Sequence, residues 1–265
     1  MDAHVISRTL ESRLSQYSKQ LGLNWAMELE LSDQQIIGIT SYPKRQAHRV
    51  TAYKGRILRI VAQGQDSTED SILGPLVHEL CHAKLIEHKY IMGLELGEVP
   101  GIVRTPKWTK RGLEDRFLVE DTVHRLASLT YDFWVDELFY KNFPNLLESS
   151  SRLFLESLST AAREGTLDKS LQTKLYLAAA YTTAQRKRLN MQPIDVSTIK
   201  SYLEHDKSNA IERLQVYWEG LPQMPLGRNE SETYNAMLER AVVEFGLPVR
   251  LKLFFRDNRP YLQLS

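Results

Sequence analysis

The spacing of apolar and polar positions predicts a helix, a small sheet and another helix in the N-terminal third of the chain. An amphipathic helix is indicated by apolar residues every three or four positions: Ile6, Leu10, Leu14, Tyr17 and Leu21. Alternation predicts strands at residues 25–31 and 35–40, and at 49–53 and 56–62 on either side of a Lys54-Gly55 turn. The next helix has apolar residues at roughly helical spacing: Ile72, Leu73, Leu76, Leu80 and Leu85.

Helical periodicity returns at residues 113–140, after a segment at 93–111 whose glycines and prolines indicate a loop. Helices are expected through 149–219, and a linker at 220–227. A helix at 233–245 then precedes two alternating strands, 249–255 and 261–264. The pattern predicts an α+β protein in three parts: a core at 1–145 with a small, mainly antiparallel sheet, a helical region at 146–220, and a linker, helix and β-hairpin at 221–265.

The candidate chemistry lies in the helix over residues 72–85, which contains His78-Glu79-Leu80-Cys81-His82. Residues four apart on a helix share a face, so the two imidazoles can occupy neighbouring corners of a zinc tetrahedron. Glu79 then lies beside the metal, where it can take a proton from water activated by zinc. The alternative is an amphipathic helix that carries two histidines by chance. Gly74-Pro75 marks either a kink or the first turn of this helix.

The order of elements in residues 1–145, together with the H-E-x-x-H motif, resembles the catalytic core of the zincin metallopeptidases. The segment His-Glu-Leu-Cys-His-Ala is similar to the motif of the SprT-like branch, whose members include proteases that digest proteins crosslinked to DNA. The order also resembles the small gluzincins, or minigluzincins, whose third ligand is a downstream glutamate. These resemblances imply a Zn²⁺ cofactor and a protein or peptide substrate. The His-Gly pair that supplies the third ligand in the SprT branch does not occur downstream in this sequence.

Several residues are candidates for the third zinc ligand. His88 has metzincin spacing, but Leu85 stands where metzincins have a helix-breaking glycine, so we expect His88 at the surface. The gluzincin resemblance favours Asp132, with Asp136 four residues later orienting a ligand histidine. Glu120, with His124 one turn on, is the rival. His124 and Tyr131 are also candidates to stabilise an oxyanion, and the acids could instead form a solvated helix face.

The composition excludes few classes of protein, but it indicates the cellular compartment. Hydrophobic residues make up 42% and charged residues 25%, and the net charge of +1 gives no general case for an anionic partner. The single cysteine, Cys81, excludes an internal disulfide framework and is expected to be a small buried residue. The N-terminus lacks a signal-peptide pattern and no apolar run has membrane-spanning length. We therefore expect a soluble, cytoplasmic protein without a membrane partner.

The C-terminal hairpin is locally basic, with aromatic residues interleaved: Arg250, Lys252, Phe254, Phe255, Arg256, Arg259 and Tyr261. Such a face can bind nucleic acid. The favoured expectation is that the hairpin docks on the body of the protein or on a second subunit. A basic run at residues 185–189 is expected to face water.

The preferred hypothesis from the sequence is a zinc-dependent endopeptidase with Glu79 as general base and zinc held by His78, His82 and Asp132. The alternative is a regulatory or scaffolding protein with a zincin fold, possible nucleic-acid association and a structural or sensing zinc.

Overall fold

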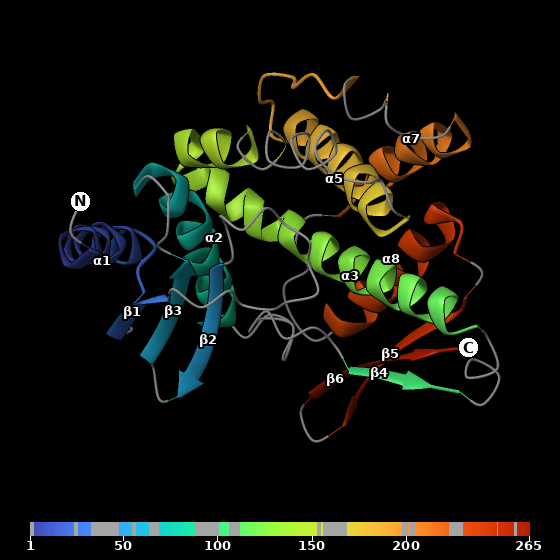
Figure 1. Ribbon diagram of the computed structural model, residues 1–265, viewed down its shortest axis with the longest axis horizontal. Coiled ribbons are helices and arrows are strands. Elements are labelled where there is room, and N and C mark those ends of the chain that lie inside the picture. The colour runs from blue at the N-terminus through green and yellow to red at the C-terminus, as the bar shows by residue number, and fades with distance from the viewer. Residues whose placement is uncertain are drawn as a thin grey trace. The chain divides into compact units, whose positions relative to one another are not determined.

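The structure is a computed structural model, and it describes residues 3–23, 26–32, 48–54, 57–63, 69–87, 101–105, 112–152, 155, 169–197, 201, 205–222, 230–247, 249–256 and 259–265. Figure 1 shows the helices and small sheets of these residues, which define an α+β protein. No described helix combines the length and apolarity needed to cross a membrane.

Contacts divide the chain into two compact units. The first comprises Met1–Lys89, Glu95–Gly97 and Val135–Ala161, and the second comprises Tyr90–Leu94, Glu98–Trp134 and Ala162–Ser265. The sequence predicted three parts: 1–145, 146–220 and 221–265. Their boundaries differ from those of the two units, and the division into three parts stays a prediction. One long helix, α3 (Leu113–Asn142), contributes residues to both units.

The first unit is built from two helices and a three-stranded sheet. Its elements are α1 (Ala3–Gln20), β1 (Ala26–Ser32), β2 (His48–Lys54), β3 (Ile57–Gln63) and α2 (Glu69–Glu87). The predicted apolar stripe of α1 is buried at Leu10 and Leu14, and α1 packs against α2 and β1. Gly22, with a φ of 67°, follows the end of α1, where a left-handed residue commonly terminates a helix. α2 packs against β2 and β3.

The sheet of the first unit has the strand order β1-β3-β2. The predicted hairpin is present, because β2 pairs antiparallel with β3. β1 pairs parallel with β3, so the described part of this sheet is mixed, with one parallel and one antiparallel pair, where a mainly antiparallel sheet was expected. Alternation of apolar residues is the same for either strand direction, so the sequence could not decide it. The strand expected at 35–40 lies outside the described residues.

α2 continues through Gly74-Pro75 instead of starting there. Gly74 allows a close approach to the helical segment 144–152, since a Cβ built on Gly74 would lie 2.9 Å from the Cβ of Ser150. Such a distance is shorter than carbon atoms tolerate without a shift of the backbone. The glycine therefore sets how closely this segment packs on the helix that carries His78 and His82.

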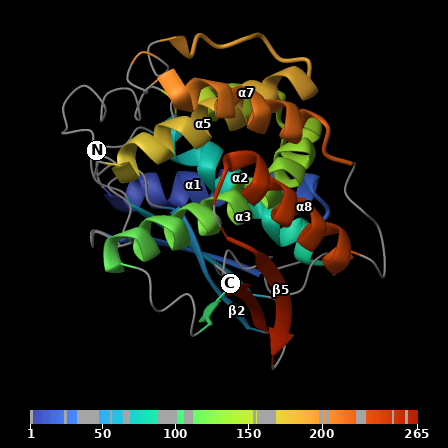
Figure 2. The same cartoon turned by 90° about the vertical axis from the view of Figure 1, so that its right-hand side faces the viewer.

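The second unit has a helical core. α5 (Lys169–Arg188) packs on α7 (His205–Glu219), and α7 packs on α8 (Glu230–Phe245), as Figure 2 shows. Aromatic rings fill the contacts: the Tyr181 and Trp218 centroids are 5.6 Å apart, and Phe133 of α3 lies 5.5 Å from Tyr181. The hydroxyl of Tyr217 donates a 2.6 Å hydrogen bond to the carbonyl of Met237. This polar group is thus satisfied inside the core.

The second sheet joins the C-terminal hairpin to a strand from the middle of the chain. Its strands β4 (Gly101–Arg104), β5 (Leu251–Arg256) and β6 (Arg259–Leu264) have the order β4-β6-β5. β5 and β6 form the predicted antiparallel pair, and β4 pairs parallel with β6. The expectation of a plain loop over 93–111 was therefore wrong for residues 101–104. Glycine and proline nearby favour a loop locally, but pairing with a strand distant in sequence overrides that preference.

The basic run at 185–189 does not face water throughout. Arg186 is 2% exposed, and its Nε donates to the carbonyl of Gln192 just beyond α5. Arg188 donates to the carbonyl of Leu221, and its guanidinium lies 5.5 Å from the centre of the Phe133 ring. Only Lys187 of the three cations is exposed, and it pairs with Glu219 at 2.6 Å. Arg186 and Arg188 thus bind backbone carbonyls just beyond the ends of α5 and α7, which a charge count could not reveal.

Gly74→Ala should lower the free energy of unfolding by about 1–2 kcal/mol, because the clash with Ser150 outweighs the better helix propensity of alanine. Denaturant unfolding measures the effect. Gly220→Ala is the matched control, since its nearest neighbour would lie 3.4 Å away, and stability should change little. Ser150→Gly in the Gly74→Ala background should recover part of the loss. An equal or greater stability of Gly74→Ala alone would contradict the close packing.

Candidate metal centre

α2 brings the two histidines of the motif together. Its buried residues Leu76, Val77 and Leu80 hold one side of the helix in the core. His82 is 7% exposed, His78 is half-buried, and their rings lie 4.8 Å apart. The Nε2 atoms face each other at 3.1 Å. Two nitrogens on adjacent corners of a zinc tetrahedron, each about 2.0–2.1 Å from the metal, are about 3.3 Å apart, so the imidazoles are close to the geometry of a ligand pair.

Asp136 of α3 fixes the orientation of His78. Its Oδ1 lies 2.9 Å from His78 Nδ1, and the aspartate is 4% exposed. A carboxylate can only accept, so Nδ1 carries the proton and donates it to this bond. In the neutral imidazole the lone pair then resides on Nε2, which is the atom turned toward His82. A carboxylate that holds the far nitrogen of a ligand histidine in this way is the usual support of a metal site.

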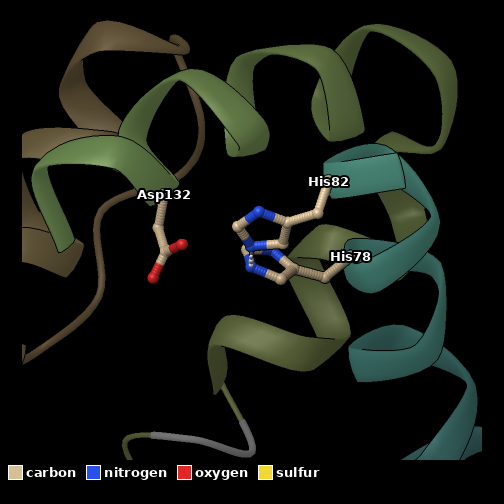
Figure 3. Close-up of side chains that lie close together, drawn as sticks. All are labelled: His78, His82 and Asp132. Atoms are coloured by element: carbon tan, nitrogen blue, oxygen red, sulfur yellow. Dashed lines mark hydrogen bonds between the residues drawn. The ribbon is translucent and has the colours of Figure 1, made fainter. Parts of the chain in front are cut away.

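Asp132 provides the third donor. One carboxylate oxygen of Asp132 and one nitrogen from each histidine lie within 4.8 Å of one another, and this is the group of metal-capable side chains found among the described residues. Figure 3 shows the Asp132 carboxylate pointing toward the two imidazoles. Asp132 precedes Asp136 by one turn of the continuous helix α3, so both aspartates lie on one face of it.

Among the described residues the donor set has three members, one fewer than the four ligands of a closed structural zinc site. Two imidazoles and one carboxylate leave a fourth tetrahedral position for water or substrate. The nitrogens already have nearly the required separation, and the Asp132 oxygen would close in by up to roughly 1.5 Å on binding. His78, His82 and Asp132 can therefore hold a metal ion.

The rival candidates on α3 lie away from this group. Glu120 is buried, at 6% exposed, but about three turns separate it from Asp132, which is about 18 Å along a helix axis. His124 is about two turns before Asp132 and half-buried. Tyr131 is 2% exposed and packs edge-on against Trp134 at 6.3 Å. The acids of α3 do not form one solvated face, because Glu120 and Asp136 are buried. His88 lies outside the described residues.

Glu79 and Cys81 have different surroundings on the same helix. Glu79 is half-buried, about 60° around the helix axis from His82. Cys81 is fully buried, as expected. Burial raises the pKa of its thiol well above the usual range, and the negative charges of Asp136 and Glu79 raise it further. The thiol therefore stays protonated at neutral pH and is neither a ligand nor a nucleophile.

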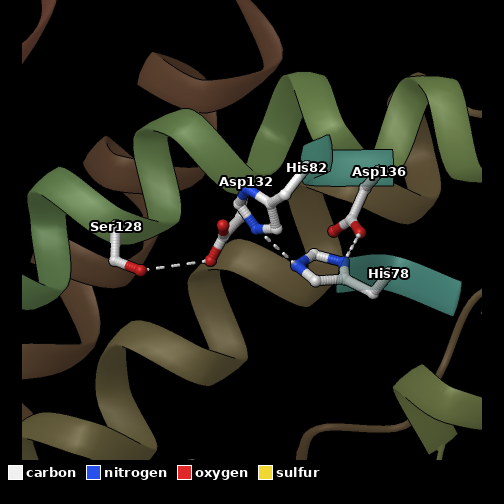
Figure 4. Close-up of polar contacts among 5 residues, drawn as sticks. All are labelled: His78, His82, Ser128, Asp132 and Asp136. Carbon is white, nitrogen blue, oxygen red and sulfur yellow. Dashed lines mark hydrogen bonds and ion pairs between the residues drawn. The ribbon is translucent and has the colours of Figure 1, made fainter. Parts of the chain in front are cut away.

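One residue of the site was missed by the sequence reasoning. Ser128 Oγ donates to Asp132 Oδ2 at 3.3 Å (Figure 4). The signal was the Ser-x3-Asp spacing, since residues four apart on a helix are neighbours.

Comparison of the chain with protein-family models, curated proteins and solved structures gave no match.

Asp132→Ala should weaken metal binding about as much as the loss of a histidine, because it removes one of three donors. Asp136→Asn should cost about 10–100-fold in affinity, since it removes the charge that orients His78. Glu120→Gln is the control and should bind metal like the wild type. Affinities come from competition with a chromophoric chelator. A Glu120→Gln variant that loses the metal while Asp132→Ala retains it would move the site to another part of α3.

Proposed function

We propose that this protein is a zinc-dependent endopeptidase of the zincin type. The observation that carries the proposal is the convergence of both histidines of H-E-x-x-H with a carboxylate from α3, and with Asp136 on the far nitrogen of His78. Two histidines and one carboxylate are the ligand set of thermolysin-like zinc peptidases. The order of α1, the small sheet, α2 and the ligand-bearing α3 agrees with the zincin resemblance.

Each residue of the site has a defined task in this proposal. His78, His82 and Asp132 hold the ion, and Asp136 keeps the lone pair of His78 Nε2 directed at it. Zinc in such a site supplies a Lewis acid that polarises the scissile carbonyl and lowers the pKa of water to about 7. Glu79 takes the proton from the attacking water and delivers it to the leaving amine. A glutamate in this position has a use in hydrolysis and none in a purely structural zinc site.

The substrate is assigned to the edge of the first sheet that lies beside α2. In zincins the peptide binds as an added strand at such an edge. Among the described strands, β1 and β2 are the outer ones, and β2 is the one that packs against α2. Backbone pairing with β2 would bind many sequences, because main-chain hydrogen bonds supply the affinity.

The purified protein should contain about one zinc per chain, and His78→Ala and His82→Ala should lose it. Glu79→Gln should keep both zinc and fold but lower the rate of casein hydrolysis by at least about 100-fold, because the amide cannot accept the proton of water. Elemental analysis and a degradation assay on the same samples measure both effects. His124→Ala is the matched control and should retain zinc.

Two results would contradict this proposal. Wild-type protein that retains no transition metal would remove the zinc site. Hydrolysis by Glu79→Gln at the wild-type rate, on a substrate that the protein cleaves, would remove Glu79 from the mechanism.

A second candidate function, nucleic-acid association, is favoured by the C-terminal hairpin. The apolar residues Leu251, Leu262 and Leu264 are buried, and α8 packs on β5. Phe254 and Tyr261 are register partners, partly exposed, with rings stacked 5.7 Å apart at 22°. Arg250 and Lys252 are exposed. Cations beside partly exposed rings suit single-stranded nucleic acid, whose phosphates and bases they can bind together.

Phe254→Leu and Tyr261→Leu should each weaken binding of a single-stranded oligonucleotide by about 1–3 kcal/mol, because leucine keeps the apolar volume but removes the flat ring. Lys252→Ala should reduce the slope of log affinity against log salt by about 0.7. Lys141→Ala removes another exposed lysine, at the end of α3, and should change neither value. Fluorescence anisotropy measures the binding. Equal affinity for all four variants and the wild type would contradict this candidate.

A further inference from the structure

The C-terminal part of α3 contacts the His78 side chain in two places. Asp136 Oδ1 lies 2.9 Å from Nδ1 of the imidazole (Figure 4). The Phe139 ring packs edge-on against the same imidazole, with 6.2 Å between the ring centres and 63° between the ring planes. Phe139 follows Asp136 by three residues, so both side chains lie on one face of the helix. All three residues belong to the first compact unit, and both contacts are therefore internal to it.

The hydrogen bond by itself leaves the imidazole able to turn. A single N–H···O bond fixes the line from Nδ1 to Oδ1, but the ring can rotate about that line within the angular range of the bond. Nε2 lies off this line, so such a rotation would carry Nε2 away from His82. Phe139 limits the rotation, because its ring meets the imidazole at a steep angle and a turned imidazole would overlap it.

Phe139 is itself held firmly enough to act in this way. Its side chain is fully buried, and its ring centre lies 6.3 Å from that of Phe143. Phe143 in turn meets Tyr17 of α1 edge-on, with 4.9 Å between the ring centres, and α1 packs on α2. A closely packed interior leaves a buried ring little room to change its rotamer. The ring that limits the rotation of His78 is therefore a fixed part of the core of this unit.

Burial also strengthens the hydrogen bond that the two helices share. Only 5% of the Asp136 side chain and 21% of the His78 side chain are exposed. Phe139 is one of the apolar groups that take the place of water around the imidazole. A hydrogen bond to a carboxylate is stronger in such surroundings than in water, because the local dielectric constant is lower.

We propose that Phe139 is a positioning residue, which together with Asp136 holds the His78 ring in the orientation that presents Nε2 to a metal ion. The inference rests on the proposed function only in that His78 is a metal ligand. It adds an apolar contact to the polar support of that ligand, and it concerns neither the substrate nor the other ligands.

The metal-free protein offers a first test. Nitrogen-15 NMR of the imidazoles reports which ring nitrogen carries the proton, and His78 of the wild type should be protonated at Nδ1 alone. Phe139→Leu should give a mixture of the two protonated forms, because leucine retains apolar volume but has no ring to keep the imidazole in line with Asp136. Phe143→Leu is the matched control. It removes a buried ring one turn farther along and should keep the Nδ1 form.

Zinc affinity, measured by competition with a chromophoric chelator, is the second test. Phe139→Leu should weaken binding about 3–10-fold, the factor that corresponds to one aromatic contact, and Phe143→Leu by less than about twofold. Asp136→Asn and Phe139→Leu act on the same ring, so their combined loss should be smaller than the product of the separate losses. Asp136→Asn combined with Phe143→Leu should give that product.

Denaturant unfolding of the metal-free variants separates positioning from general packing. Both leucine variants remove one buried ring and should be destabilised by similar amounts, so only a direct effect on His78 separates their zinc affinities. Phe139→Met also removes the ring, and it replaces the leucine variant if that variant does not fold.

Three results would overturn the inference. A Phe139→Leu protein with the wild-type NMR spectrum and zinc affinity would do so and would leave the proposed function standing. Equal losses of zinc affinity in Phe139→Leu and Phe143→Leu would also do so, because packing in general would then explain them. If the wild type binds no zinc, the inference and the proposed function fail together.

Discussion

The hydrogen bond between His78 Nδ1 and Asp136 Oδ1 connects α2 with α3 through two groups that are largely removed from water. A buried carboxylate without a partner would be costly, so this bond constrains both helices at once. It determines which nitrogen of His78 carries the proton and therefore which nitrogen can bind a metal. It also sets the rotation of α3, because Asp132 lies on the same face one turn earlier. The orientation of His78 in the candidate metal centre therefore depends on this bond.

The opposite side of α3 explains why that rotation is stable. Thr130 and Trp134 lie roughly half a turn around the helix from the two aspartates, and both are buried. The indole of Trp134 donates to the carbonyl of Pro222 at 3.2 Å, and that of Trp218 to the hydroxyl of Thr130 at 3.5 Å. With large side chains packed on that side, the short acidic residues must face the other way. Packing within the second unit thus contributes to the orientation of Asp132, which belongs to the same unit.

Much of the fold could be predicted because local periodicity reports it directly. The helices at 3–20, 113–142 and 169–188 and the C-terminal hairpin lie close to their expected positions. The direction of β1, the strand at 101–104 and the burial of Arg186 could not be predicted, since each depends on a partner distant in sequence. For the site, the H-E-x-x-H spacing was enough to pair His78 with His82, because helix geometry relates them. The choice of Asp132 over Glu120 needed the resemblance to a family, because both are acids on one helix.

The sequence by itself determined the chemistry that one helix can carry: two imidazoles on one face, and a glutamate beside them. Those relations follow from 3.6 residues per turn and need no other part of the chain. Only the tertiary structure decided which carboxylate lies beside the two imidazoles and which nitrogen of His78 is protonated. Each of these depends on how α3 is rotated and placed, and burial of the apolar side chains around it determines that placement. Spacing along a chain carries no information about that rotation, so this part of the site could be seen only in the folded molecule.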